Sequence, residues 1–252
     1  MKITFLNPGR QYTADEVENC RQRQQELSRQ MTRLIDVLYA LVLAQGAVYY
    51  RSLFTLSDEF SHPSRFLPVV LALVLIYFTA IQSFIDYHFA SEDQPYQLLD
   101  KSRRRKDLGR FYLDVLIVGA YSFLLLKCHV LLAAPAADLA PVFLAYVAIF
   151  AFFIVWGELR RSTANPPERR YAPGLLFVAL GIYLGLWAAY TRFPSGDWVI
   201  NAVFLFAALV VMLTYRWLNW TQTNYCGEAA LATDTDPCQG SRPASTPLPG
   251  VT

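Results

Sequence analysis

The chain has 252 residues, of which 54% are hydrophobic, 17% are charged and 15% are aromatic. Soluble domains average about 25% charged residues, so this composition excludes a disordered chain and argues against a soluble enzyme. The formal net charge is only +2, and the basic residues form short blocks between apolar runs rather than one basic surface. A nucleic-acid-binding protein is therefore not expected.

Six apolar stretches approach the length of roughly 20 residues that a membrane-spanning helix needs. They are residues 34–50, 66–89, 111–134, 141–158, 174–190 and 198–217. The first 33 residues are too polar and too long for the n-region of a signal peptide, so we expect the first span to remain in the mature protein. The sequence predicts an all-α integral membrane protein with six transmembrane helices.

Polar segments flank the six spans. Residues 1–33 are predicted to form a cytoplasmic helical segment that begins with a capping box, Thr13 followed by Glu16, and continues into the first span. Residues 34–217 make up the predicted transmembrane domain. Residues 218–252 contain four prolines among Ser, Thr, Gly and Asp, a composition that cannot bury a core, and are predicted to be a disordered cytoplasmic tail.

The distribution of Lys and Arg predicts the orientation, because cytoplasmic loops retain positive charge. With the N-terminus inside, 18 of the 22 Lys and Arg residues fall in cytoplasmic segments or, in the case of Arg216, at the cytoplasmic end of the last span. The external loops contain only Arg51, Arg65 and Arg192, and Lys127 lies within the third span. Both termini are therefore predicted to be cytoplasmic.

The sequence contains no motif that is typical of an enzyme or a metal site. HExxH, GxSxG and P-loop motifs are missing, and there are three histidines in total. The four cysteines are far apart and form no CxxC pair, which argues against a disulfide framework and a zinc site; they are Cys20, Cys128, Cys226 and Cys238. We expect a protein that is not an enzyme and that binds no cofactor or metal.

Ionisable side chains inside spans are costly and often functional. Asp36 lies one turn inside the first span, His88 ends the second and Asp114 begins the third, all near the predicted cytoplasmic face. Asp36 could be a headgroup-level carboxylate paired with Arg33 or Arg29, or it could have a role in helix packing or gating. We predict a network of these three residues through which Asp36 holds the first helix against the next two.

The first span also carries an apolar stripe. At about 100° per residue, one side of this helix presents Leu34, Val37, Leu38, Leu41, Ala44, Gln45 and Val48. If the stripe lines a pore, the constriction is apolar and gates by dewetting rather than by filtering through rings of carbonyl groups. Ordinary helix packing would explain the same stripe equally well, so both interpretations stay open at this point.

Three segments carry a resemblance to a known family. They are Leu34-Ile35-Asp36-Val37-Leu38-Tyr39-Ala40-Leu41, Phe84-Ile85-Asp86-Tyr87-His88-Phe89 and Leu113-Asp114. The first is similar to a signature of Arg, three residues, Phe-Ser-Asp, three residues and Ala-Ile. The second is similar to a Trp-x-Asn-His-His segment, and the third to a Leu-Asn step. The pattern resembles the transmembrane protein 175-like family of endolysosomal and bacterial potassium leak channels, although Leu34-Ile35 replaces Phe-Ser and Gln30 stands where the Arg would be.

This resemblance implies a homo-oligomer, a tetramer in bacterial members, with a pore lined by the first helix. It also implies a hydrophobic constriction at Leu41, with Ala44 in place of a nearby threonine. The predicted function is a divergent, potassium-type cation channel in a bacterial inner (plasma) membrane, whose partners are the lipid bilayer, monovalent cations and copies of the chain. The alternative is a non-conducting membrane scaffold or sensor that recruits cytoplasmic partners.

Overall fold

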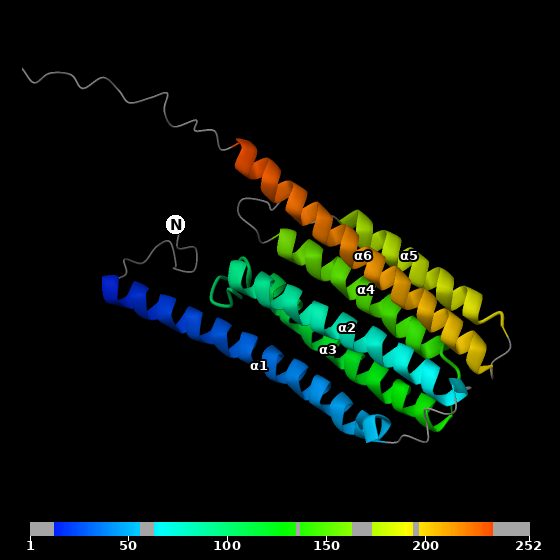
Figure 1. Cartoon of the computed structure of the whole chain (residues 1–252). Coiled ribbons are helices and arrows are strands. Elements are labelled where there is room, and N and C mark those ends of the chain that lie inside the picture. The colour runs from blue at the N-terminus through cyan, green and yellow to red at the C-terminus, as the bar shows by residue number, and fades with distance from the viewer. Residues whose placement is uncertain (1–12, 56–62, 135–136, 163–172, 194–196, 234–252) are drawn as a thin grey trace, which may run out of the picture.

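The computed structural model describes residues 13–55, 63–134, 137–162, 173–193 and 197–233, and these fold into six α-helices without a strand (Figure 1). The helices are α1 (Ala14–Thr55), α2 (Pro63–Asp93), α3 (Arg104–Ala133), α4 (Ala140–Arg161), α5 (Pro173–Tyr190) and α6 (Trp198–Thr233). Each one contains one of the six apolar stretches, apart from a single residue at the end of the third. The all-helical class predicted from the sequence is confirmed for the described residues.

The helices form an up-and-down bundle in which neighbours along the chain run in opposite directions (Figure 1). Helices α2, α3, α4, α5 and α6 contact one another in that order, and α6 returns to contact α2. We call this arrangement the five-helix ring. Helix α1 lies outside it and packs on α3 and, over a smaller area, on α2.

Five of the helices contain segments that are long and apolar enough to cross a membrane. These segments are Asp15–Val48, Phe66–Glu92, Arg104–Leu131, Ala140–Arg161 and Trp198–Trp220. They indicate an integral membrane protein. Helix α5 is shorter, with 18 residues, or about 27 Å at 1.5 Å per residue. Its role as a sixth span stays a prediction.

One end of the bundle collects most of the described basic residues. Because the helices alternate in direction, the start of α1, the α2–α3 connection and the C-terminal ends of α4 and α6 all lie at this end (Figure 1). It contains Lys101 and Arg103–Lys106 at the α2–α3 connection, and Arg160 and Arg161 at the end of α4. We call it the basic end.

Helix α1 begins at the predicted capping box. The Glu16 backbone N–H donates to Thr13 Oγ1 at 3.3 Å, and the Thr13 backbone N–H donates to Glu16 Oε2 at 3.0 Å. These bonds satisfy two of the amides that a helix start leaves without partners. From there α1 runs for 42 residues without a break into its apolar half, which confirms the predicted continuity.

The C-terminal helix is longer than the sequence predicted. Residues 218–252 were expected to be disordered, but α6 continues to Thr233. The helix can extend because the first proline of this region is Pro237, and because Glu228–Ala232 are mostly strong helix formers. Residues 234–252 lie outside the described residues, so the remainder of that prediction is not addressed.

Buried tyrosines tie the helices together through backbone carbonyl groups. Their hydroxyls donate across helix pairs, from Tyr50 to Leu125 O at 3.0 Å, from Tyr121 to Thr79 O at 3.2 Å and from Tyr183 to Ala208 O at 2.9 Å. The aromatic rings fill the core, while each hydroxyl finds an acceptor that the apolar surroundings do not otherwise supply. These bonds fix the helices around the site described next.

Candidate functional site

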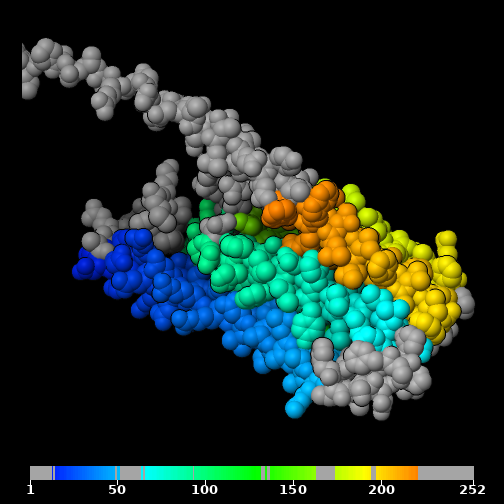
Figure 2. Space-filling view, in the orientation of Figure 1, coloured from blue at the N-terminus to red at the C-terminus, as the bar shows by residue number. Residues whose placement is uncertain are grey.

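The residues predicted to line a pore lie on the side of α1 that faces away from the five-helix ring. Four of them are 49% to 75% exposed and Ala44 is also exposed; together they form the outer face of α1, which comprises Leu34, Val37, Leu41, Ala44 and Val48. Leu38 and Gln45 are half-buried at its edge. Figure 2 shows α1 along one edge of the molecule. Packing within the described chain therefore does not explain this stripe.

The opposite side of α1 is buried. Its buried residues recur every three or four positions and are Ile35, Tyr39, Val42, Gly46 and Tyr50. This spacing places them on one helical face. The outer face is thus an additional apolar surface on a helix that already packs on the bundle. A helix that is apolar on both sides is surrounded by protein or by lipid.

Two of the three residues of the predicted network, Asp114 and His88, each pair with a residue outside that network. Asp114 accepts a hydrogen bond from Tyr96 Oη at 2.6 Å. The Nε2 atom of His88 lies 3.3 Å from an oxygen of Glu92, one turn further along α2. Asp36 is near enough to His88 for an electrostatic interaction, but its buried Oδ1 has no hydrogen-bond partner in the described part of the chain. The role of Asp36 in holding α1 stays a prediction.

The α2–α3 connection is fixed by buried polar side chains. Asp107 Oδ2 accepts from the Gln97 backbone N–H at 2.8 Å, and Gln24 Oε1, on α1, accepts from the Leu99 N–H at 2.7 Å. Tyr96 lies in the same connection and points into the bundle. Its burial, followed by the adjacent Asp114 carboxylate, raises the pKa of the Tyr96 hydroxyl, so this group stays protonated and remains a donor to Asp114.

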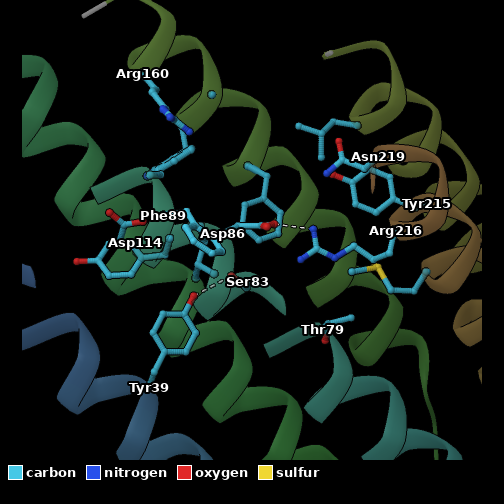
Figure 3. Close-up of a pocket in the computed structure, with 18 of the residues that line it drawn as sticks. Tyr39, Thr79, Ser83, Asp86, Phe89, Asp114, Arg160, Tyr215, Arg216 and Asn219 are labelled. Carbon is cyan, nitrogen blue, oxygen red and sulfur yellow. Dashed lines mark hydrogen bonds and ion pairs between the residues drawn. The ribbon is translucent and has the colours of Figure 1, made fainter. Parts of the chain in front are cut away.

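A pocket of about 290 Å³ opens into the bundle towards the basic end. All six helices contribute to its lining, and Figure 3 shows the side chains that converge on it. Its polar residues include Tyr39, Ser83, Asp86, Asp114, Arg160 and Arg216. The sequence did not predict this pocket, although Asp114 belonged to the predicted network.

An ion pair between α2 and α6 crosses one side of the pocket (Figure 3). Arg216 donates through NH1 to Asp86 Oδ2 at 2.6 Å and through NH2 to Gln82 Oε1 at 2.9 Å. The Arg216 side chain is only 12% exposed, so its charge is held largely out of water. Such a charge needs a partner, and Asp86 supplies one.

The sequence carried a weak signal for this pair. Arg216 is the only charged residue between Trp198 and Trp220, and an arginine inside an apolar span is expected to have a counter-charge. Several acidic residues of the sequence could have supplied this counter-charge. Asp86 is the partner because α2 contacts α6 in the fold. The two residues are 130 positions apart in the sequence, and the periodicity of a single helix cannot reveal a contact with another helix.

The described residues contain no group of three or more His, Cys, Asp or Glu side chains placed to hold a metal ion. Cys20 and Cys128 are free thiols. Comparisons with known protein families, curated proteins and solved structures found no match to this chain. The resemblance to the transmembrane protein 175-like family therefore stays a prediction from the residues.

Proposed function

We propose that this chain is the subunit of a cation channel in which the outer face of α1 lines the pore. The observation that supports this function best is the exposure of that face on a helix outside the five-helix ring. The described exposed residues between Arg33 and Arg51 carry no charge. At 1.5 Å per residue this interval is about 27 Å long, close to the roughly 30 Å thickness of a hydrocarbon core.

The pore in this proposal forms between copies of the chain. A cyclic assembly brings the same surface of every subunit to one axis, so a face on the edge of the bundle can line a shared channel without any change in the fold. A tetramer and selectivity for potassium rest on the family resemblance. At Leu41, a ring of apolar side chains would close the pore by dewetting, since it offers nothing to replace the hydration of an ion.

The proposed subunit crosses the membrane six times and has both termini in the cytoplasm. The sixth crossing is supported by the position of α5, which contacts α4 and α6 and runs antiparallel to both (Figure 1). The orientation is supported by the excess of Lys and Arg at the basic end. The resemblance to bacterial members supports a location in a bacterial inner (plasma) membrane.

A non-conducting scaffold or sensor is the second candidate. It is favoured by the first part of α1, where most side chains between residues 15 and 33 are exposed and the helix projects beyond the five-helix ring (Figure 1). In this alternative the projecting segment recruits a cytoplasmic partner, and the outer face of α1 contacts lipid.

Leu41→Asn distinguishes the two candidates. In a pore, a polar ring at this level keeps water in the constriction, so we expect potassium flux from proteoliposomes to rise several-fold above that of the wild type. Leu144→Asn on α4 is the matched control, because Leu144 is 51% exposed and Leu41 is 60% exposed. The control should leave flux unchanged.

If correctly inserted Leu41→Asn protein passes no more potassium than the wild type or the Leu144→Asn control, the outer face of α1 does not line a pore. The scaffold alternative would then account better for the exposed segment of α1.

A further inference from the structure

The two acidic residues of the α2–α3 connection and the first turn of α3 are buried and already have partners. Asp100 is 3% exposed, and its Oδ1 atom accepts hydrogen bonds from the backbone N–H of Ser102 at 2.9 Å and from its hydroxyl at 2.7 Å. Asp107 is 2% exposed and forms an ion pair with Arg110, which is itself buried. Both carboxylates are therefore used inside the fold.

The basic residues of the same segment remain on the outside. Three of them are exposed, as is one at the end of α4, and Lys106 joins the two elements, because its Nζ atom donates to Ser162 O at 3.2 Å. Among the described residues, none of the four exposed members has an ion-pair partner. We call this patch the basic surface; it comprises Lys101, Arg104, Arg105 and Arg161. Its charges are open to an anion from outside the chain.

The basic surface lies at the depth of lipid headgroups. Arg104 begins the apolar segment of α3 and Arg161 ends that of α4, and both helix ends lie at the basic end of the bundle (Figure 1). Trp217 and Trp220, at the same end of α6, are 62% and 64% exposed, as is typical of side chains at a membrane interface. An anionic partner at this depth is a lipid headgroup rather than a soluble macromolecule.

The connection that carries most of these charges is held in place by buried polar groups. Gln24 Oε1 accepts from the Leu99 N–H at 2.7 Å, and Asp107 Oδ2 accepts from the Gln97 N–H at 2.8 Å. A surface that is already ordered loses less conformational freedom when it binds a partner. The fold thus presents the basic surface ready for binding.

We infer that the basic surface binds the anionic headgroups of phospholipids in the leaflet at the basic end. Clusters of Lys and Arg next to a transmembrane helix attract anionic lipids. An excess of basic residues is enough to orient a membrane protein, but orientation alone does not require that the neighbouring acids be buried while the bases stay exposed. The inference goes beyond the proposed channel and does not depend on ion conduction.

The test measures binding of phosphatidylglycerol with a fluorescent acyl chain to the full chain in an uncharged detergent. The wild type should bind it saturably, and phosphatidylcholine with the same fluorophore should bind more weakly. The triple variant Lys101→Gln/Arg104→Gln/Arg105→Gln should raise the half-saturating concentration of phosphatidylglycerol about 100-fold, at about fivefold for each basic residue near a lipid surface. Arg105→Gln alone should raise it about fivefold and keeps the test valid if the triple variant does not fold.

The matched control is Arg21→Gln/Arg23→Gln/Arg29→Gln, which removes three exposed arginines from α1 at the same end of the bundle. Both triple variants lower the net charge by three, but residues 14–33 contain four acidic and four basic residues, so this segment has no excess of positive charge. The control should bind phosphatidylglycerol as the wild type does. Equal weakening in the two triple variants would mean that overall charge, and not the basic surface, attracts the lipid.

Three further outcomes would overturn the inference. The first is the absence of saturable binding to the wild type, and the second is equal binding of the two lipids. The third is competition by a soluble anion: if glycerophosphoglycerol, the headgroup without acyl chains, or a short RNA displaces the lipid at a concentration below that of phosphatidylglycerol itself, the basic surface serves a soluble partner.

Discussion

Gly46 lies where α1 makes a close approach to its neighbours. A Cβ atom at this position would overlap Tyr77 Oη and would lie 3.1 Å from Leu125 Cδ2. The Tyr77 hydroxyl donates to Leu43 O at 2.9 Å, so it cannot move aside without losing its acceptor. A glycine is thus needed for α1 to contact α2 and α3 at this level.

Gly46→Ala should lower the free energy of unfolding by about 1 to 3 kcal/mol, the usual cost of overpacking a filled interior. Gly181→Ala is the matched control, since a Cβ there has nothing within 4 Å, and it should leave stability unchanged or raise it by up to about 1 kcal/mol. Unfolding of both variants in detergent, monitored by circular dichroism, checks this. Equal stability of the two variants would contradict the tight contact at Gly46.

One side chain joins the first half of α1 to the α2–α3 connection. Gln24 donates through Nε2 to Tyr96 O and accepts at Oε1 from the Leu99 N–H. Gln24 is buried, although most of its neighbours on α1 are exposed. It therefore fixes a helix segment that has few other contacts with the bundle.

Gln24→Ala should release the Leu99 amide, so that this amide exchanges its hydrogen faster, and should cost about 1 to 3 kcal/mol for the buried groups left without partners. Gln25→Ala, at the adjacent exposed position, should change neither quantity. Hydrogen–deuterium exchange of peptides that cover residues 94–103 provides the measurement. Wild-type exchange in Gln24→Ala would show that α1 is held by other contacts.

The elements themselves were largely predictable from the sequence. Long apolar runs revealed all six helices, and Thr13 with Glu16 revealed the start of α1, because both signals are local. The pairing of Gln24 with Leu99, and of Arg216 with Asp86, depends on which helices are neighbours. The outer face of α1 was identified as a stripe, but only the fold distinguishes its exposed residues from the buried Ile35 and Tyr39.

The proposed orientation of the protein in the membrane has a direct test. In a background without the native cysteines, Arg51→Cys should react with a membrane-impermeant maleimide added to intact cells, because α1 ends near Arg51 on the proposed outer side. Lys101→Cys, in the α2–α3 connection, should react only after the cells are permeabilised. Labelling of Lys101→Cys in intact cells would reverse the orientation.

The proposed assembly predicts contact between the outer faces of neighbouring copies. Leu41→Cys should form disulfide-linked dimers on mild oxidation in membranes, since an apolar constriction brings equivalent positions close to the distance of about 6 Å that a disulfide bridges between Cα atoms. Leu144→Cys should remain monomeric on a denaturing gel. If the two variants form disulfide-linked dimers to the same extent, the dimers arise from random collisions and the proposed contact between outer faces is wrong.

The unbroken length of α1 has a mechanical consequence. A helix of 42 residues is a rod of about 63 Å, so a torque applied outside the membrane is transmitted along its axis to the apolar half. Gln24 binds this helix to the α2–α3 connection, ten residues before Leu34. The angle that the outer face of α1 takes relative to the five-helix ring is therefore set in part by the α2–α3 connection.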